Sequence, residues 1–230
     1  MNIQGLQKLT LLDFPEHTAC TVFTGGCDLR CPFCHNVPLV LDPTGGNTID
    51  EADFFAFLET RKGLLDGVAV TGGEPLLQPD IAGFLSEIKK RGFNVKLDTN
   101  GAFPDRLKAV LDAGLVDYVA MDVKNRPEKY ALTCGIDGQS YAPFKKSIEI
   151  IMTSGVDYEF RTTVVDEFHT IEDIAAIGDE IRGAKRYFLQ AFKDSGILDE
   201  TSSHAASEQK MQAMLSAVRE KVQYADLRGV

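Results

Sequence analysis

The chain has 230 residues, of which 44% are hydrophobic and 25% are charged. This length and composition suffice for one sizeable core, so we expect a single domain over residues 1–230. The formal net charge is −10 and no dense block of Lys or Arg occurs, which disfavours nucleic acids and anionic membranes as partners. The sequence does not open on a charged-then-apolar leader, and its apolar runs are shorter than a membrane span, which favours a cytoplasmic protein.

Short β-rich runs alternate with segments of helical periodicity. The predicted strands cover residues 18–24, 67–71, 94–98, 116–122, 158–165 and 186–192. Apolar stripes predict helices between residues 79 and 92, around 107–114, after Thr170 and from Ser207 onward. Thr170 and Asp173 resemble a capping box. The last helix is expected to bury Met211, Met214, Leu215 and Val218. This repetition predicts an α/β fold with a parallel sheet.

Polar residues at the ends of the predicted strands help to choose between two parallel architectures. Parallel strands with helical crossovers suit a doubly wound sheet or an incomplete barrel. Residues that a core does not use follow the strands, at 24–27, 71–75, 98–101 and 122–124. In a barrel such strand ends meet at one mouth, whereas the G-x-G-x-x-G turn of a Rossmann fold is missing from the sequence. We therefore expect an incomplete (βα)6 barrel with outer helices.

Three cysteines, Cys27, Cys31 and Cys34, form a C-x3-C-x2-C array after the first predicted strand. A structural zinc site needs four ligands, and a histidine directly after the third cysteine rarely points at the same metal. A four-iron cluster can instead be held by three thiolates, with one iron open to another ligand. Cys20 and Cys134 are expected to be ordinary buried or loop thiols. The array indicates a metal or catalytic site in a reducing compartment, not a disulfide scaffold.

The array resembles the signature of the radical S-adenosylmethionine (SAM) enzymes, and other motifs follow in matching order along most of the chain. The resemblance implies that the three cysteines hold a [4Fe–4S] cluster whose open iron binds SAM. Gly72, Gly73, Glu74 and Pro75 resemble the GGEP motif of this family, which meets the amino group of SAM. A carboxylate is a suitable acceptor for an ammonium group.

Within this family the sequence is most similar to the activases of glycyl radical enzymes, through its CHN, DTNG and D-x-K elements. The resemblance implies that SAM, and in some members a monovalent cation, is surrounded by Asp98, Thr99, Asn100, Asp122, Lys124 and His169. Arg161, in the middle of a predicted strand, is a candidate for contact with SAM or substrate, and a buried structural ion pair is the alternative. The alternative for Asp98 is a turn cap, and for His169 a solvated loop histidine.

The stretch QGLQKLTLLDFPEHTACTVFTGGC at residues 4–27 most resembles the longer form of the activating proteins of anaerobic ribonucleoside-triphosphate reductases. The resemblance implies an oxidoreductase that cleaves SAM reductively and abstracts hydrogen from a glycine of that reductase. A flavodoxin or a ferredoxin would be the low-potential electron donor. One alternative is an activase of another glycyl radical enzyme, such as pyruvate formate-lyase. A non-catalytic zinc-binding interaction module is the other.

Overall fold

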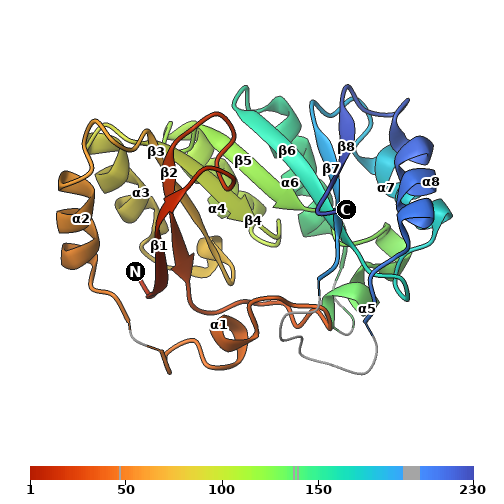
Figure 1. Cartoon of the computed structure of the whole chain (residues 1–230), viewed down its shortest axis with the longest axis horizontal. Coiled ribbons are helices and arrows are strands. Elements are labelled where there is room, and N and C mark those ends of the chain that lie inside the picture. Colours follow the sequence, from red (N-terminus) through yellow and green to blue (C-terminus); the bar gives the residue numbers. More distant parts are fainter. Residues whose placement is uncertain (47, 137, 139, 194–202) are drawn as a thin grey trace.

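The computed structural model describes residues 1–46, 48–136, 138, 140–193 and 203–230, and its centre is one eight-stranded sheet (Figure 1). The strands lie in chain order from β1 to β8. At one edge, β1 (Ile3–Thr10) runs antiparallel to β2 (Ala19–Thr24). The remaining strands continue the sheet in parallel: β3 (Gly67–Gly72), β4 (Asn94–Thr99), β5 (Tyr118–Asp122), β6 (Asp157–Val164), β7 (Tyr187–Ala191) and β8 (Ala225–Arg228). The sheet therefore ends at β1 and β8 and is not closed.

The longer helices lie along the outside of the curved sheet (Figure 1). They are α2 (Glu51–Glu59), α3 (Ile81–Lys90), α4 (Pro104–Asp112), α6 (Ala142–Thr153), α7 (Ile171–Glu180) and α8 (Glu208–Val218). The short elements are α1 (Val37–Leu41), α5 (Tyr130–Cys134) and the 3-10 turns η1 (Pro75–Leu77) and η2 (Pro127–Lys129). In the part of the chain that the structure describes, no helix combines the length and apolar character needed to cross a membrane.

The core lies between the sheet and these helices. The central strands are buried along most of their length because helices cover one face and the opposite face curves around the interior, as in β5 with Val119, Ala120 and Met121. The apolar stripes of the helices point to the same layer. All four residues that the sequence predicted to be buried in α8 are buried.

The predicted α/β fold with a parallel, unclosed sheet is confirmed. All six predicted strands are present, with ends within two residues of those expected. A doubly wound sheet is excluded, because its strand order reverses whereas this sheet keeps chain order throughout. The capping box at Thr170 and Asp173 is also present, with both reciprocal hydrogen bonds.

Candidate functional site

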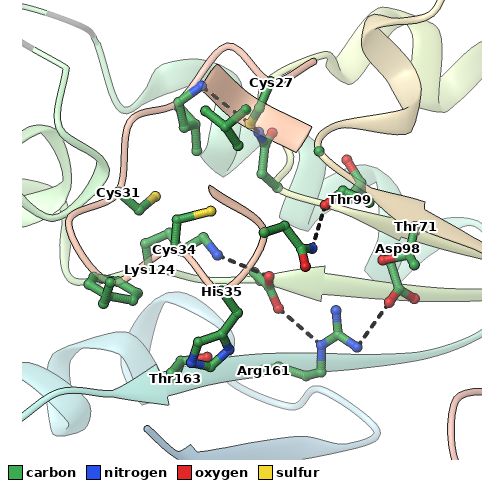
Figure 2. Close-up of a pocket in the computed structure, with 18 of the residues that line it drawn as sticks. Cys27, Cys31, Cys34, His35, Thr71, Asp98, Thr99, Lys124, Arg161 and Thr163 are labelled. Carbon is green, nitrogen blue, oxygen red and sulfur yellow. Dashed lines mark hydrogen bonds and ion pairs between the residues drawn. The ribbon is translucent and has the colours of Figure 1, made fainter. Parts of the chain in front are cut away.

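The carboxyl ends of the strands surround a cavity of about 240 Å³, which we call the cysteine cavity (Figure 2). Most of the predicted site residues line it: Cys27, Cys31, Cys34, Gly72, Gly73, Asp98, Thr99, Asn100, Asp122, Lys124 and Arg161. His35 and Asn36 of the CHN element also line the cavity, and residues to which the sequence analysis gave no role complete part of the wall: Thr71, Thr163 and Gln190. Glu74 and His169, which were predicted to contact SAM, are not among the lining residues.

The three cysteines lie on the loop between β2 and α1, and buried neighbours hold that loop in place. Leu29 and Phe33, which lie between the cysteines, are almost fully buried and anchor the loop to the core. The amide of Cys34 donates to the carbonyl of Cys31 at 3.1 Å, which closes a tight turn. As a result, the side chains of Cys31 and Cys34 point into the same space in Figure 2.

The donor set at this loop fits a cluster better than a single metal ion. Among the residues described, no group of three or more His, Cys, Asp or Glu side chains is placed to hold one metal ion. A four-iron cluster does not require such convergence, because each thiolate binds a different iron. Burial raises the pKa of the Cys27 thiol to about 12, so metal binding here would release its proton. Three thiols line the cavity, whereas a closed structural zinc site has four ligands that converge on one ion.

The glycines beside the loop allow backbone segments to approach closely. Gly72 ends β3 with a φ of +121°, and a Cβ there would lie 2.3 Å from the amide nitrogen of Thr24. A Cβ on Gly73 would lie 2.0 Å from the carbonyl oxygen of Gly26. The side-chain amide of Asn36 donates to the carbonyl of Gly72 at 2.8 Å. Only glycine therefore fits at Gly72 and Gly73, and the cysteine loop is joined directly to the end of β3.

A row of five alternating charges crosses the floor of the cavity on β4, β5 and β6. Lys96 pairs with Asp98, and Arg161 bridges Asp98 at 3.2 Å and Asp122 at 3.0 Å. Lys124 completes the row by donating to Asp122 at 2.9 Å. Burial alone would raise the pKa of Asp122, but the charges of Lys124 and Arg161 outweigh it and hold that pKa well below its usual range. Both carboxylates are therefore ionised and fixed.

Arg161 forms the buried ion pairs that were one interpretation and also lines the cavity, so its contact with SAM or substrate stays a prediction. Lys96 was missed by the sequence analysis. It lies two residues before Asp98 on the same face of β4, and this spacing is the only sequence signal for their contact. Lys96 is buried, so Asp98 is its essential partner.

Glu74 is fully buried beneath the cavity and joins the ends of β3 and β4. Its carboxylate accepts hydrogen bonds from the amide of Leu76 at 2.9 Å, the hydroxyl of Thr99 at 2.9 Å and the amide of Asn100 at 2.7 Å. Burial raises the pKa of Glu74 to about 8, although these donors act in the opposite direction. The geometry gives Glu74 a structural task, and its contact with SAM stays a prediction.

His169 is fully buried, which excludes the solvated loop histidine. Its Nδ1 accepts from the amide of Val165 at 3.1 Å, and its Nε2 lies 2.8 Å from the carbonyl of Lys124. Burial lowers the pKa of His169, so the neutral ring with a proton on Nε2 satisfies both contacts. His169 thus holds the backbone of Lys124, and its contact with SAM also stays a prediction.

Comparison with known proteins gives the family. The model of the radical SAM superfamily matches residues 21–181. A protein of Methanocaldococcus jannaschii, provisionally named a glycyl-radical enzyme activating enzyme, is 33% identical over 202 residues, which cover 86% of this chain and 82% of that protein. The pyruvate formate-lyase-activating enzyme of Clostridium pasteurianum is 28% identical over 202 residues, covering 85% and 83%.

A solved structure gives the same result for the fold. SuiB of Streptococcus suis, bound to S-adenosylmethionine, superposes with a TM-score of 0.66 at 15% identity, covering 90% of this chain and 49% of that one. At this identity the likeness concerns the fold alone. The match of the family model over residues 21–181, together with the M. jannaschii relative, shows that the chain belongs to the radical SAM superfamily, whose enzymes use a [4Fe–4S] cluster and SAM.

Proposed function

We propose that this enzyme activates a glycyl radical enzyme by generating a radical on a glycine of that partner. The observation that carries the proposal is the cysteine cavity, in which three thiols face ionised and polar groups at the ends of parallel strands. The names of the M. jannaschii and C. pasteurianum relatives support the activating role. When bound, the cluster and SAM supply the reductive cleavage that yields methionine and the 5′-deoxyadenosyl radical.

The chain itself supplies attachment, orientation and a sheltered space. We assign Cys27, Cys31 and Cys34 to the cluster. The fixed carboxylates of Asp98 and Asp122 face the cavity and are suited to orient the polar groups of SAM. A monovalent cation beside SAM would have to compete with Arg161 and two lysines for these same carboxylates.

We further propose an anaerobic ribonucleoside-triphosphate reductase as the partner. The sequence of residues 4–27 suggested this target, and the segment ends at Cys27 in the cysteine loop. Its turn between β1 and β2 contributes Leu11, Leu12 and Asp13 to a neighbouring cavity of about 560 Å³. This second cavity shares Asp98 and Arg161, among others, with the cysteine cavity. A partner segment seated against residues 11–13 would therefore approach Asp98 and Arg161 from the amino ends of the strands, opposite the cysteine loop.

The open sheet supports the same proposal, because an unclosed side admits a polypeptide loop whereas a closed barrel offers only its mouth. Leu11 and Leu12 are 71% and 90% exposed, which makes this turn an apolar contact region at the amino end of β2. We expect electrons to come from a flavodoxin or a ferredoxin.

The test is anaerobic incubation of the cluster-loaded enzyme with reductant, SAM and the purified reductase. Electron paramagnetic resonance should then show a glycyl radical, with methionine and 5′-deoxyadenosine formed alongside. A reductase whose radical-site glycine is replaced by alanine should give no glycyl radical signal. If a radical formed only with pyruvate formate-lyase, the proposed activase function would stand, but the proposed partner would be wrong. SAM cleavage without a radical on any glycyl radical enzyme would contradict the proposed function.

A further inference from the structure

Gln190, near the carboxyl end of β7, lies where three cavities meet. It lines the cysteine cavity, the cavity of about 560 Å³ beside residues 11–13, and a third cavity of about 390 Å³ that we call the edge cavity. The edge cavity lies at the carboxyl ends of β7 and β8, where Ala191, Lys193 and Gly229 contribute to its wall. Among the residues that the structure describes, only Gln190 lines all three cavities. A segment that reaches the cysteine cavity from either of the other two therefore passes this side chain.

Two further polar residues share the border between the cysteine cavity and the edge cavity. Thr163 of β6 is the register partner of Gln190, and both side chains line the two cavities. His35 lines both cavities as well, and its ring stacks on that of Phe192 with 5.5 Å between the centroids. Figure 2 shows His35 and Thr163 together on the side of the cavity away from Cys27. This border is thus a polar wall between the open edge of the sheet and the cysteines.

The side-chain amide of Gln190 is available for a ligand. In the described part of the chain, it has no hydrogen-bond partner, and neither does the hydroxyl of Thr163. The charged residues nearby differ, because Arg161 is held by both Asp98 and Asp122. Gln190 is half-buried, so a ligand that fills the border would exclude water from its amide and would have to satisfy the oxygen and the NH2 group.

The proposed reaction requires a site that recognises polypeptide backbone. Glycine has no side chain, so its α-carbon can be positioned only through the backbone N–H and C=O groups around it. In an extended segment the N–H and C=O of one residue point to the same side, as in the residue pairs of an antiparallel sheet that exchange two hydrogen bonds. A primary amide can form the same two bonds, because it carries a donor and an acceptor side by side.

We propose that Gln190 binds the backbone of the partner protein beside the glycine that becomes the radical. Its NH2 group donates to the carbonyl oxygen of one flanking residue, and its oxygen accepts from the N–H of that same residue. Thr163 offers a hydroxyl next to this pair. The inference rests on the proposed function and adds to it the side chain that positions the partner's glycine at the edge of the cysteine cavity.

The first test measures binding without turnover. Isothermal titration calorimetry gives the affinity of the cluster-loaded, SAM-bound enzyme for the reductase, or for whichever glycyl radical enzyme the wild type activates, with no reductant present. Gln190→Met keeps the length of the side chain and removes its hydrogen bonds, so it should weaken this affinity by about ten- to hundredfold. Gln190→Asn keeps the amide and should fall between Gln190→Met and the wild type. Gln212→Met, at an exposed position of α8, is the matched control and should bind as the wild type does.

The second test uses a readout that a merely structural role would not change selectively. With reductant present, Gln190→Met should cleave SAM at the wild-type rate but form fewer glycyl radicals for each SAM cleaved, because the glycine is no longer held in place. Electron paramagnetic resonance counts the radicals, and chromatography of 5′-deoxyadenosine counts the SAM cleaved. Iron content and SAM affinity of the variant should equal those of the wild type.

The outcomes separate this inference from the function on which it rests. If Gln190→Met kept the wild-type affinity for the partner and the wild-type number of radicals per SAM, the inference would be overturned while the activase function stood. A loss of SAM affinity in this variant would assign Gln190 to SAM and would also overturn the inference. If the wild-type enzyme formed a radical on no glycyl radical enzyme, the proposed function would be wrong, and the role of Gln190 would be wrong with it.

Discussion

At the scale of single residues, the site combines fixed charges with three thiols. Asp98 and Asp122 are each shared between Arg161 and a lysine, so neither carboxylate can turn without breaking an ion pair. Such an arrangement holds polar groups in one orientation before any ligand arrives. Burial raises the pKa of the Cys27 and Cys34 thiols, so these two depend on a bound metal to become thiolates.

The cluster assignment predicts a sharp division among the cysteines. Changing Cys27, Cys31 or Cys34 to alanine should abolish both the cluster and SAM cleavage, because three thiolates are the minimum set. Cys20→Ala should preserve both, since Cys20 is buried in β2 away from the cavity lining. Iron and sulfide analysis of anaerobically purified variants measures this directly. Full iron content in Cys31→Ala would remove the basis of the assignment.

Glu74→Gln should destabilise the protein by about 1–3 kcal/mol, because an amide cannot accept from donors on both of its terminal atoms and leaves a buried donor unpaired. Urea unfolding measures this loss. An unchanged free energy of unfolding would show that the three hydrogen bonds to Glu74 make no net contribution to stability.

The raised pKa of Glu74 also predicts that the stability of the protein depends on pH. Its folded pKa of about 8 lies above the ordinary value, so the unfolded chain releases this proton at lower pH than the folded chain does. The contribution of the group to stability is therefore complete at about pH 4 and falls as pH rises to about 8. The difference in unfolding free energy between wild type and Glu74→Gln should decline over that window and be level above it.

The sequence indicated most of the site, because short motifs at strand ends place their residues at one edge of a parallel sheet. It could not indicate which polar groups face inward. Glu74 and His169 belong to such motifs, yet their side chains are used by neighbouring backbone groups. The backbone contact between Cys134 and Arg30 could not be predicted either, because it arises from the packing of α5 and not from spacing in the sequence.

At the scale of secondary-structure elements, the strands with a strong apolar pattern were predicted from the sequence, and the strands with a weak pattern were not. The six inner strands are apolar runs and were found, whereas β1 and β8 were not predicted. Only Ile3 and Thr10 are buried in β1, and no residue of the four-residue β8 is fully buried. Edge strands carry little hydrophobic signal because one side faces solvent, so their pattern resembles that of a loop.

The start of α7 allows a prediction at this scale. Thr170→Ala should destabilise the protein by about 1 kcal/mol, because the amide of Asp173 loses its side-chain acceptor and the capping box is broken. Thr170→Ser should retain most of the stability. Thr153→Ala, on the exposed side of α6, is the matched control and should be close to neutral. Equal midpoints in urea for Thr170→Ala and Thr153→Ala would contradict the role of the cap.

At the scale of the whole molecule, one ion pair ties the last strand to the interior of the sheet. Arg228 of β8 donates to both oxygens of buried Glu159 of β6, at 2.7 and 2.8 Å, and passes over the ring of Phe188. The hydroxyl of Tyr118 donates to the same carboxylate at 2.9 Å. These contacts reach across β7 and hold the open edge of the sheet in place.

Arg228→Met should destabilise the protein by roughly 3 kcal/mol, since it leaves Glu159 buried without its cation and Tyr118 compensates only in part. Arg228→Lys should fall between Arg228→Met and wild type, because it keeps the charge but loses the two-point contact. Arg219→Met, at an exposed position, is the control. Thermal unfolding of the wild type and the three variants gives the order of their stabilities. If Arg228→Met had the melting temperature of the wild type, the ion pair between Arg228 and Glu159 would not stabilise the protein.

The order of the strands has a consequence for how the protein is made. Every strand pairs only with its neighbours in the sequence, so no strand must wait for a distant later one before it can pair. The sheet can therefore grow from β1 toward β8 while the chain leaves the ribosome. The cysteine loop follows β2, so its thiols emerge early and stay uncovered until β3 to β6 have been synthesised, which makes a reducing environment important during synthesis as well as afterwards.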